Sequence, residues 1–146
     1  MPTCPNCGQQ WVYDPLSAKQ VNEQEERAWR LVKRWVPLLG LDNWNISIKV
    51  SQADLPDIAV VRNCAALADC EWAYRSIRIR VHGPFAAQAT DERMEYHLLH
   101  EFCHGMVNEM RQFAESTWND AMRHEERVVD HLADAFLRVR KADANA

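Results

Sequence analysis

The sequence lacks the features that would place a protein in a membrane or in the secretory pathway. No apolar run in its 146 residues approaches the length needed to cross a bilayer. The N-terminal stretch MPTCPNCG has no basic segment followed by an apolar one. Internal repeats and low-complexity tracts are also missing. We therefore expect a cytoplasmic protein whose length suits one modest hydrophobic core.

An excess of positive charge is absent as well. The chain has 17 Lys and Arg against 21 Asp and Glu, which gives a net charge of −4. No global basic field would attract nucleic acid or an anionic membrane, so neither is expected as a partner. Five cysteines, an odd number, indicate thiols or metal ligands rather than a disulfide framework.

Periodicity and boundary signals predict an α+β fold for residues 17–146, preceded by a separate head at 1–16. Ser17 is suited to cap the first helix, and Thr90 or Asp91 to cap the helix that carries the motif described below. The expected elements are a helix at about 18–36, strands at 44–50, 59–68 and 74–81, and helices at about 91–112 and 119–140. Alternating apolar residues in the strands fit a small antiparallel sheet with one face covered by helices.

The segment HLLHEFCHGM, residues 97–106, carries the most specific chemistry in the chain. His100 and His104 are four residues apart, so on a helix they lie one turn above each other on the same face. Imidazole nitrogens are good zinc ligands, and the intervening Glu101 lies close enough to act on a water at the ion. A catalytic zinc site of this kind needs a third protein ligand from elsewhere.

The last predicted helix supplies candidates for that third ligand. Glu126 is followed by Asp130 one turn later, and a ligating histidine usually donates its second N–H to a carboxylate. Glu126 as ligand and Asp130 as the supporting carboxylate therefore make a complete site. Glu125 is the alternative, because it lies nearer the middle of the apolar stripe, but Val129 stands one turn after it. We favour Glu126.

The sequence His100-Glu101-Phe102-Cys103-His104 followed by Glu126-x-x-x-Asp130 resembles the HExxH and ExxxD pair of the gluzincin metallopeptidases. In size and element order the chain is similar to their minimal members, the minigluzincins, and to small HExxH proteins of phages and bacteria. The resemblance implies zinc held by His100, His104 and Glu126, with Glu101 as general base. Larger gluzincins carry a His or Tyr that stabilises the transition state in a downstream domain. Here the available side chains are those of Tyr74, Tyr96, His97 and His124.

The head contains Cys4-x-x-Cys7-Gly8, which is half of a zinc knuckle. Cys64 and Cys70 are the residues that could complete a structural site of four thiolates. Three interpretations remain open: a site of these four cysteines, a knuckle completed by another chain, or a head that binds no metal.

These patterns lead to one main hypothesis and two alternatives. The main one is a zinc metallopeptidase that hydrolyses peptide bonds of a peptide or protein through a metal-activated water with Glu101 as base. We expect the strand ending near Val81 to offer the edge on which the substrate pairs. The first alternative is a weakly active metal-binding regulatory or scaffold protein on a gluzincin frame. The second is a protease of DNA-bound proteins, since SprT-like peptidases combine HExxH with a zinc ribbon, but these use a third histidine, for which only His124 is available.

Overall fold

The computed structural model describes residues 15–52, 65–112 and 118–144. These residues form five α-helices and a three-stranded sheet, which confirms the predicted α+β class. The helices are α1 (Ala18–Val32), α2 (Trp35–Leu38), α3 (Gly83–Gln88), α4 (Asp91–Gln112) and α5 (Trp118–Asp143). The strands are β1 (Asn45–Ser51), β2 (Ala66–Glu71) and β3 (Ser76–His82), and a single turn of 3-10 helix, η1 (Trp72–Tyr74), joins the last two. No helix in these ranges is both long and apolar enough to span a bilayer.

The sheet is mixed rather than antiparallel, so the predicted topology is wrong. The strand order is β1-β3-β2, with β1 parallel and β2 antiparallel to β3. The last strand in sequence thus lies in the middle, and Ile77, Ile79 and Val81 on it are buried. Because β3 has a neighbour on each side, the strand ending at Val81 cannot offer a free edge, which corrects that expectation too.

Helix boundaries follow local chemistry, with two differences from the prediction. Ser17 caps α1 as expected and forms a capping box with Gln20. The helix predicted to reach residue 36 ends at Val32, and the chain turns into the separate short helix α2. A second difference is the short helix α3, which the prediction lacked and which Gly83-Pro84 opens, since proline is tolerated in the first turn of a helix.

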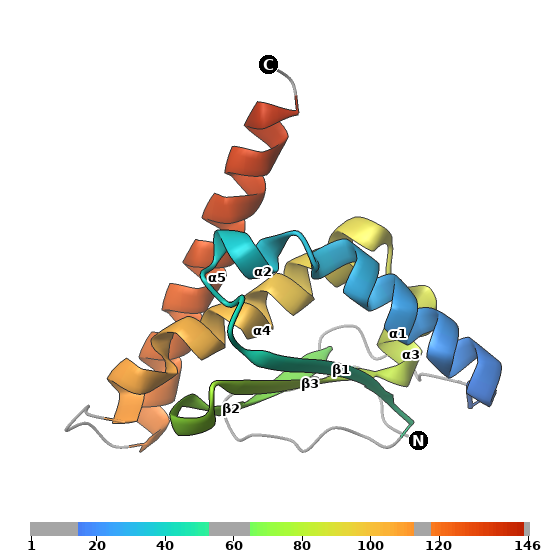
Figure 1. Ribbon diagram of the computed structural model, residues 1–146, viewed down its shortest axis with the longest axis horizontal. Coiled ribbons are helices and arrows are strands. Elements are labelled where there is room, and N and C mark those ends of the chain that lie inside the picture. Colours follow the sequence, from blue (N-terminus) through green and yellow to red (C-terminus); the bar gives the residue numbers. More distant parts are fainter. Residues whose placement is uncertain (1–14, 53–64, 113–117, 145–146) are drawn as a thin grey trace.

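Helix α4 lies at the centre of the molecule. Figure 1 shows it crossing above the sheet, with α1 beside it and α5 packed along it. The core between α4 and the sheet is apolar, and its fully buried side chains include Met94, Leu98, Leu99, Phe102 and Ile77. At Gly105 the helix comes so close to β3 that a Cβ atom would lie 2.7 Å from Ile77 Cδ1. The glycine after His104 thus lets this end of the helix lie directly on the sheet.

A buried carboxylate joins α2, α4 and α5. Glu95 is only 2% exposed. It accepts a hydrogen bond of 2.9 Å from the indole N–H of Trp35 and charge-assisted bonds from Arg34 and Arg140. A buried charge is tolerated only when it is paired and hydrogen-bonded, so this cluster requires the three helices to meet in one arrangement.

Candidate metal centre

The two histidines of the HExxH motif face the same space, as their spacing on α4 requires. The Nε2 atoms of His100 and His104 are 3.1 Å apart, and the rings meet edge to face with centroids 4.8 Å apart. Both side chains are largely but not fully buried. The pair is therefore shielded from bulk solvent on most sides while one side stays accessible.

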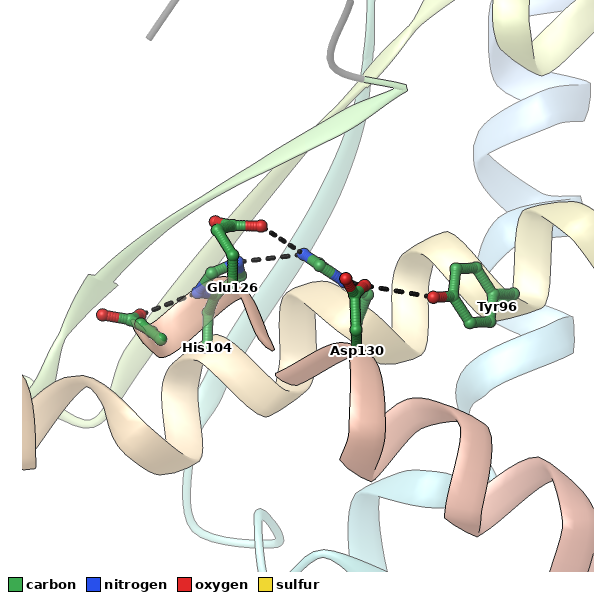
Figure 2. Close-up of polar contacts among 6 residues, drawn as sticks. Tyr96, His104, Glu126 and Asp130 are labelled. Atoms are coloured by element: carbon green, nitrogen blue, oxygen red, sulfur yellow. Dashed lines mark hydrogen bonds and ion pairs between the residues drawn. The ribbon is translucent and has the colours of Figure 1, made fainter. Parts of the chain in front are cut away.

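Glu126 reaches the same point from α5. One of its carboxylate oxygens lies 3.3 Å from His100 Nε2 and the other lies 3.2 Å from His104 Nε2. Figure 2 shows the carboxylate above the two rings. Within the described ranges, these three residues form a group of metal-capable donors whose ligand atoms all lie within 4.8 Å of one another.

The donor separations fit a zinc ion. Zinc bonds of about 2.0–2.1 Å in a tetrahedron place neighbouring ligand atoms about 3.3 Å apart. The two Nε2 atoms are 3.1 Å apart, and each lies 3.2–3.3 Å from a different oxygen of Glu126. Two imidazoles and one carboxylate with a fourth position open are also a known ligand set of catalytic zinc sites. The chemistry and the spacing of the donors therefore suit this metal.

Two further carboxylates contact the imidazoles at Nδ1, the ring nitrogen that faces away from the shared space. Asp130 Oδ1 lies 2.9 Å from His100 Nδ1, where a supporting carboxylate was expected. Glu125 Oε1 lies 2.7 Å from His104 Nδ1. With each Nδ1 bonded to a carboxylate, both rings turn Nε2 toward the shared space, the orientation that a metal site needs.

The position of Glu125 is the feature that the sequence analysis missed. It was considered only as a rival ligand, on the ground that it lies near the apolar stripe of α5. Its nearness to the apolar stripe does indicate burial, since both Glu125 and Val129 are buried. Consecutive helix residues point about 100° apart, so both glutamates can face α4 and reach different sides of the same imidazole.

Glu101 lies against the sheet. Its side chain is buried, and it accepts a hydrogen bond from the backbone N–H of Ala68 on β2. Burial raises the pKa of this carboxyl above its usual value, although both histidines and the Ala68 bond oppose the shift. Glu101 therefore stands beside the three donors, fixed to the strand that borders the site.

Ion pairs among the side chains of the site shift the pKa values of their partners. Burial disfavours the imidazolium of His104, yet hydrogen bonds to Glu125 and Glu126 raise its pKa to about 10. Burial would raise the pKa of Glu126, but the two histidines lower it to about 2. The pKa of His100 is raised by its hydrogen bond to Glu126 and by nearby carboxylates, with burial again opposing. The protons on these imidazoles occupy the positions where a cation would bind.

Tyr96 extends the network by one step. Its hydroxyl donates to Asp130 Oδ1 over 3.1 Å, which Figure 2 shows at the end of the chain of contacts. Burial, together with the charge of Asp130, raises the tyrosine pKa to about 12. Four residues were considered as stabilisers of a transition state. Tyr96 is the one that joins the site, and it does so through Asp130, on the Nδ1 side of His100.

The other three lie away from the donors. His97 packs edge-on between Phe85 and Tyr96, and burial lowers its pKa to about 4. His124 is exposed and contacts Arg127 at 2.6 Å through its Nδ1. Tyr74 is 78% exposed on η1. None of these three contacts His100, His104 or Glu126 through a hydrogen bond found among the described residues.

The cysteines proposed for a structural zinc site are mostly outside the described residues. Cys4, Cys7 and Cys64 fall there. Cys70 lies on β2, partly buried against the core. The knuckle at residues 1–16 thus stays a prediction.

Comparisons with known proteins do not assign the chain to a family. No protein-family model, no curated protein and no solved structure shows a significant match to it.

Proposed function

We propose that this protein is a zinc-dependent peptidase. The observation that carries the proposal is the convergence of His100, His104 and Glu126, whose ligand atoms lie within 4.8 Å of one another, with Glu101 beside them. Zinc bound there would lower the pKa of a water molecule and polarise the carbonyl of the substrate.

Residues of the chain would transfer the protons and orient the metal ligands. Glu101 would accept a proton from the attacking water and pass it to the leaving amine. Its raised pKa supports this role, because a general base works best when its pKa approaches the working pH. Glu125 and Asp130 would keep the imidazoles oriented while the charge in the site changes.

An extended peptide is the substrate that suits this site, because an edge strand of the sheet lies next to it. β2 is an edge strand of the described sheet, and Ala68 in its middle contacts Glu101. Because the N–H of Ala68 points to Glu101 rather than to β3, backbone groups of alternate β2 residues also point away from the sheet. A peptide that adds to this edge would run past Glu101, so we place the substrate on β2.

The scaffold alternative has one observation in its favour. Tyr96 is bound to Asp130, while Tyr74, His97 and His124 lie away from the donors. No side chain among the four is placed to stabilise a developing oxyanion. A metal-binding protein of low turnover would need no such group.

The geometry gives the DNA-linked alternative less support. Its third histidine would have to be His124, which is exposed and contacts Arg127, whereas Glu126 occupies the corresponding position.

We also propose a cytoplasmic location, on the ground of the five cysteines.

Glu101→Gln tests the proposal directly. The variant keeps the size of the side chain and should keep the metal, because Glu101 is not one of the three donors. Cleavage of unstructured proteins should fall by about two to four orders of magnitude, the range for a lost acid–base group. Glu92→Gln, on the surface of the same helix, is the control and should match the wild type.

Chelation followed by zinc addition completes that experiment. Wild-type cleavage should disappear with the chelator and return with zinc. Equal cleavage by wild type and Glu101→Gln would refute the mechanism. Zinc binding with no cleavage in any sample would favour the scaffold function.

A further inference from the structure

Helix α5 is apolar over a wider arc than its own molecule covers. Val129, Ala133 and Leu137 are buried against the rest of the fold. A second stripe, formed by Val128, Leu132, Ala135 and Val139, lies about 130° around the helix from the first. In this stripe Val128 is 48% exposed and Val139 is 61% exposed. α4 and α2 therefore bury one side of α5 and leave an apolar side uncovered by described residues.

The spacing of the second stripe is that of a coiled-coil seam. Its residues, continued by Ala142, follow one another at intervals of four, three, four and three. This is the heptad spacing that keeps apolar side chains facing a partner helix over successive turns. We call Val128, Leu132, Ala135, Val139 and Ala142 the α5 seam.

The seam is exposed except at Leu132, which is half-buried, and it lies away from the metal centre. Glu126 and Asp130 project from α5 about 150–170° around the helix from the seam. Figure 1 shows the C-terminal end of α5 extending past the other described elements. A partner helix could therefore lie along the seam without approaching His100 or His104.

Charges beside the seam suit a second copy of the same helix. Arg138 and Asp143 flank it on opposite sides and are five residues apart. In a parallel pair of helices, a residue on one flank meets the residue five positions later on the opposite flank of its partner. Neither side chain forms an ion pair within the described part of the chain.

We propose that two copies of this protein associate through their α5 helices in parallel. Each seam residue would meet its own counterpart across a two-fold axis, and Arg138 would pair with Asp143 of the partner subunit. This inference does not depend on the peptidase proposal, because the seam contains no residue of the metal centre. The seam is short, so we expect a dimer that dissociates on dilution.

Sedimentation velocity of the full chain, from low micromolar to a few hundred micromolar, tests the proposal. The wild type should shift from monomer to dimer over this range. Val139→Lys and Ala135→Lys, which place a charge in the seam, should each weaken the dimer at least about tenfold. Leu38→Lys is the matched control, because Leu38 is 72% exposed on α2 and should leave association unchanged. Unchanged far-UV circular dichroism would show that the variants remain folded.

Charge exchange tests the parallel orientation. Arg138→Asp alone should weaken the dimer, and the Arg138→Asp/Asp143→Arg double variant should restore it. A wild type that stays monomeric throughout, or a dimer that Val139→Lys does not affect, would overturn the proposal. Failure of the double variant to restore association would overturn the parallel arrangement.

Discussion

Two consecutive glutamates on α5 contact the histidines of α4 in different ways. Glu126 lies between the Nε2 atoms of His100 and His104, whereas Glu125 contacts the Nδ1 of His104. One carboxylate is thus placed to bind a metal, and the other to orient a ligand. The two roles differ in which ring nitrogen each carboxylate contacts, so single substitutions of the two glutamates can test them.

We predict that Glu126→Gln and Glu125→Gln weaken zinc binding to different extents. Loss of a supporting carboxylate costs about 10- to 100-fold in affinity, and in Glu125→Gln the new amide oxygen can still accept from the Nδ1–H of His104. Loss of a ligand carboxylate at Glu126 should cost more. Competition with a chromophoric chelator measures both, with Glu92→Gln as control. A greater loss for Glu125→Gln would show that Glu125 is the ligand.

Zinc affinity should increase with pH. The ion pairs with Glu125 and Glu126 raise the pKa of His104 to about 10, and that of His100 is also raised, so zinc must displace protons from both imidazoles. Each proton released adds about a tenfold gain in apparent affinity per pH unit. Titration from about pH 6 to about pH 8, in buffers of different ionisation enthalpy, gives the affinity and the number of protons. Affinity that does not change with pH would contradict the ion pairs described here.

The sequence allowed some roles in the site to be predicted and not others. His100 and His104 were predictable because helix geometry alone brings residues four apart to one face. The function of Glu125 was not, since it depends on how closely α5 lies against α4. The positions of His97 and Tyr96 also depend on packing, because Phe85 and Asp130 come from other elements.

At the scale of elements, Glu95 determines how α2 and α5 meet α4. It bonds to Trp35, Arg34 and Arg140, and so joins the start of the HExxH helix to the end of the glutamate helix. The metal centre lies farther along the same pair of helices. The Glu95 cluster therefore supports the alignment that brings Glu126 to the histidines.

We predict that Glu95→Gln lowers the free energy of unfolding by about 2–4 kcal/mol. Breaking a buried ion pair costs about 3–5 kcal/mol when the partner stays buried, and here both arginines retain some access to water. Glu92→Gln removes only an exposed pair with Lys141 and should leave the free energy of unfolding almost unchanged. Urea unfolding monitored by circular dichroism compares the two. Equal losses would mean that the cluster contributes no more than a surface ion pair.

Strand order could not be predicted, although β1 and β3 could. The strand predicted at 59–68 shares only residues 66–68 with β2, and residues 59–64 lie outside the described ranges. β1 and β3 alternate apolar and polar residues clearly, and this fixes which face is buried. The alternation is the same for parallel and antiparallel pairing, so it does not identify neighbours. The insertion of β3 between β1 and β2 depends on how the intervening chain crosses the sheet, which periodicity does not encode.

At the scale of the whole molecule, zinc should stabilise the fold. The donors lie on two helices that come together only when the protein is folded, so zinc binds the native state preferentially. Free zinc at about 100 times its dissociation constant should add about 2.7 kcal/mol. This corresponds to a rise of roughly 5–10 °C in Tm for a chain of this size.

Thermal unfolding with and without zinc checks this effect. The double variant His100→Ala/His104→Ala, made in a Cys4→Ser/Cys7→Ser background, should show no rise in Tm. The cysteine background alone should retain most of it. A rise that persists without the two histidines would place the stabilising metal elsewhere in the chain.

An anomalous-scattering map recorded at the zinc edge tests the central claim most directly. We predict a peak between α4 and α5, about 2.0–2.1 Å from the Nε2 atoms of His100 and His104 and from an oxygen of Glu126. Glu101 should lie near the peak without binding it, and Glu125 should remain on Nδ1 of His104. A zinc-loaded protein with no peak at this position, or with Glu101 or Glu125 bound to the metal in place of Glu126, would contradict the proposed site.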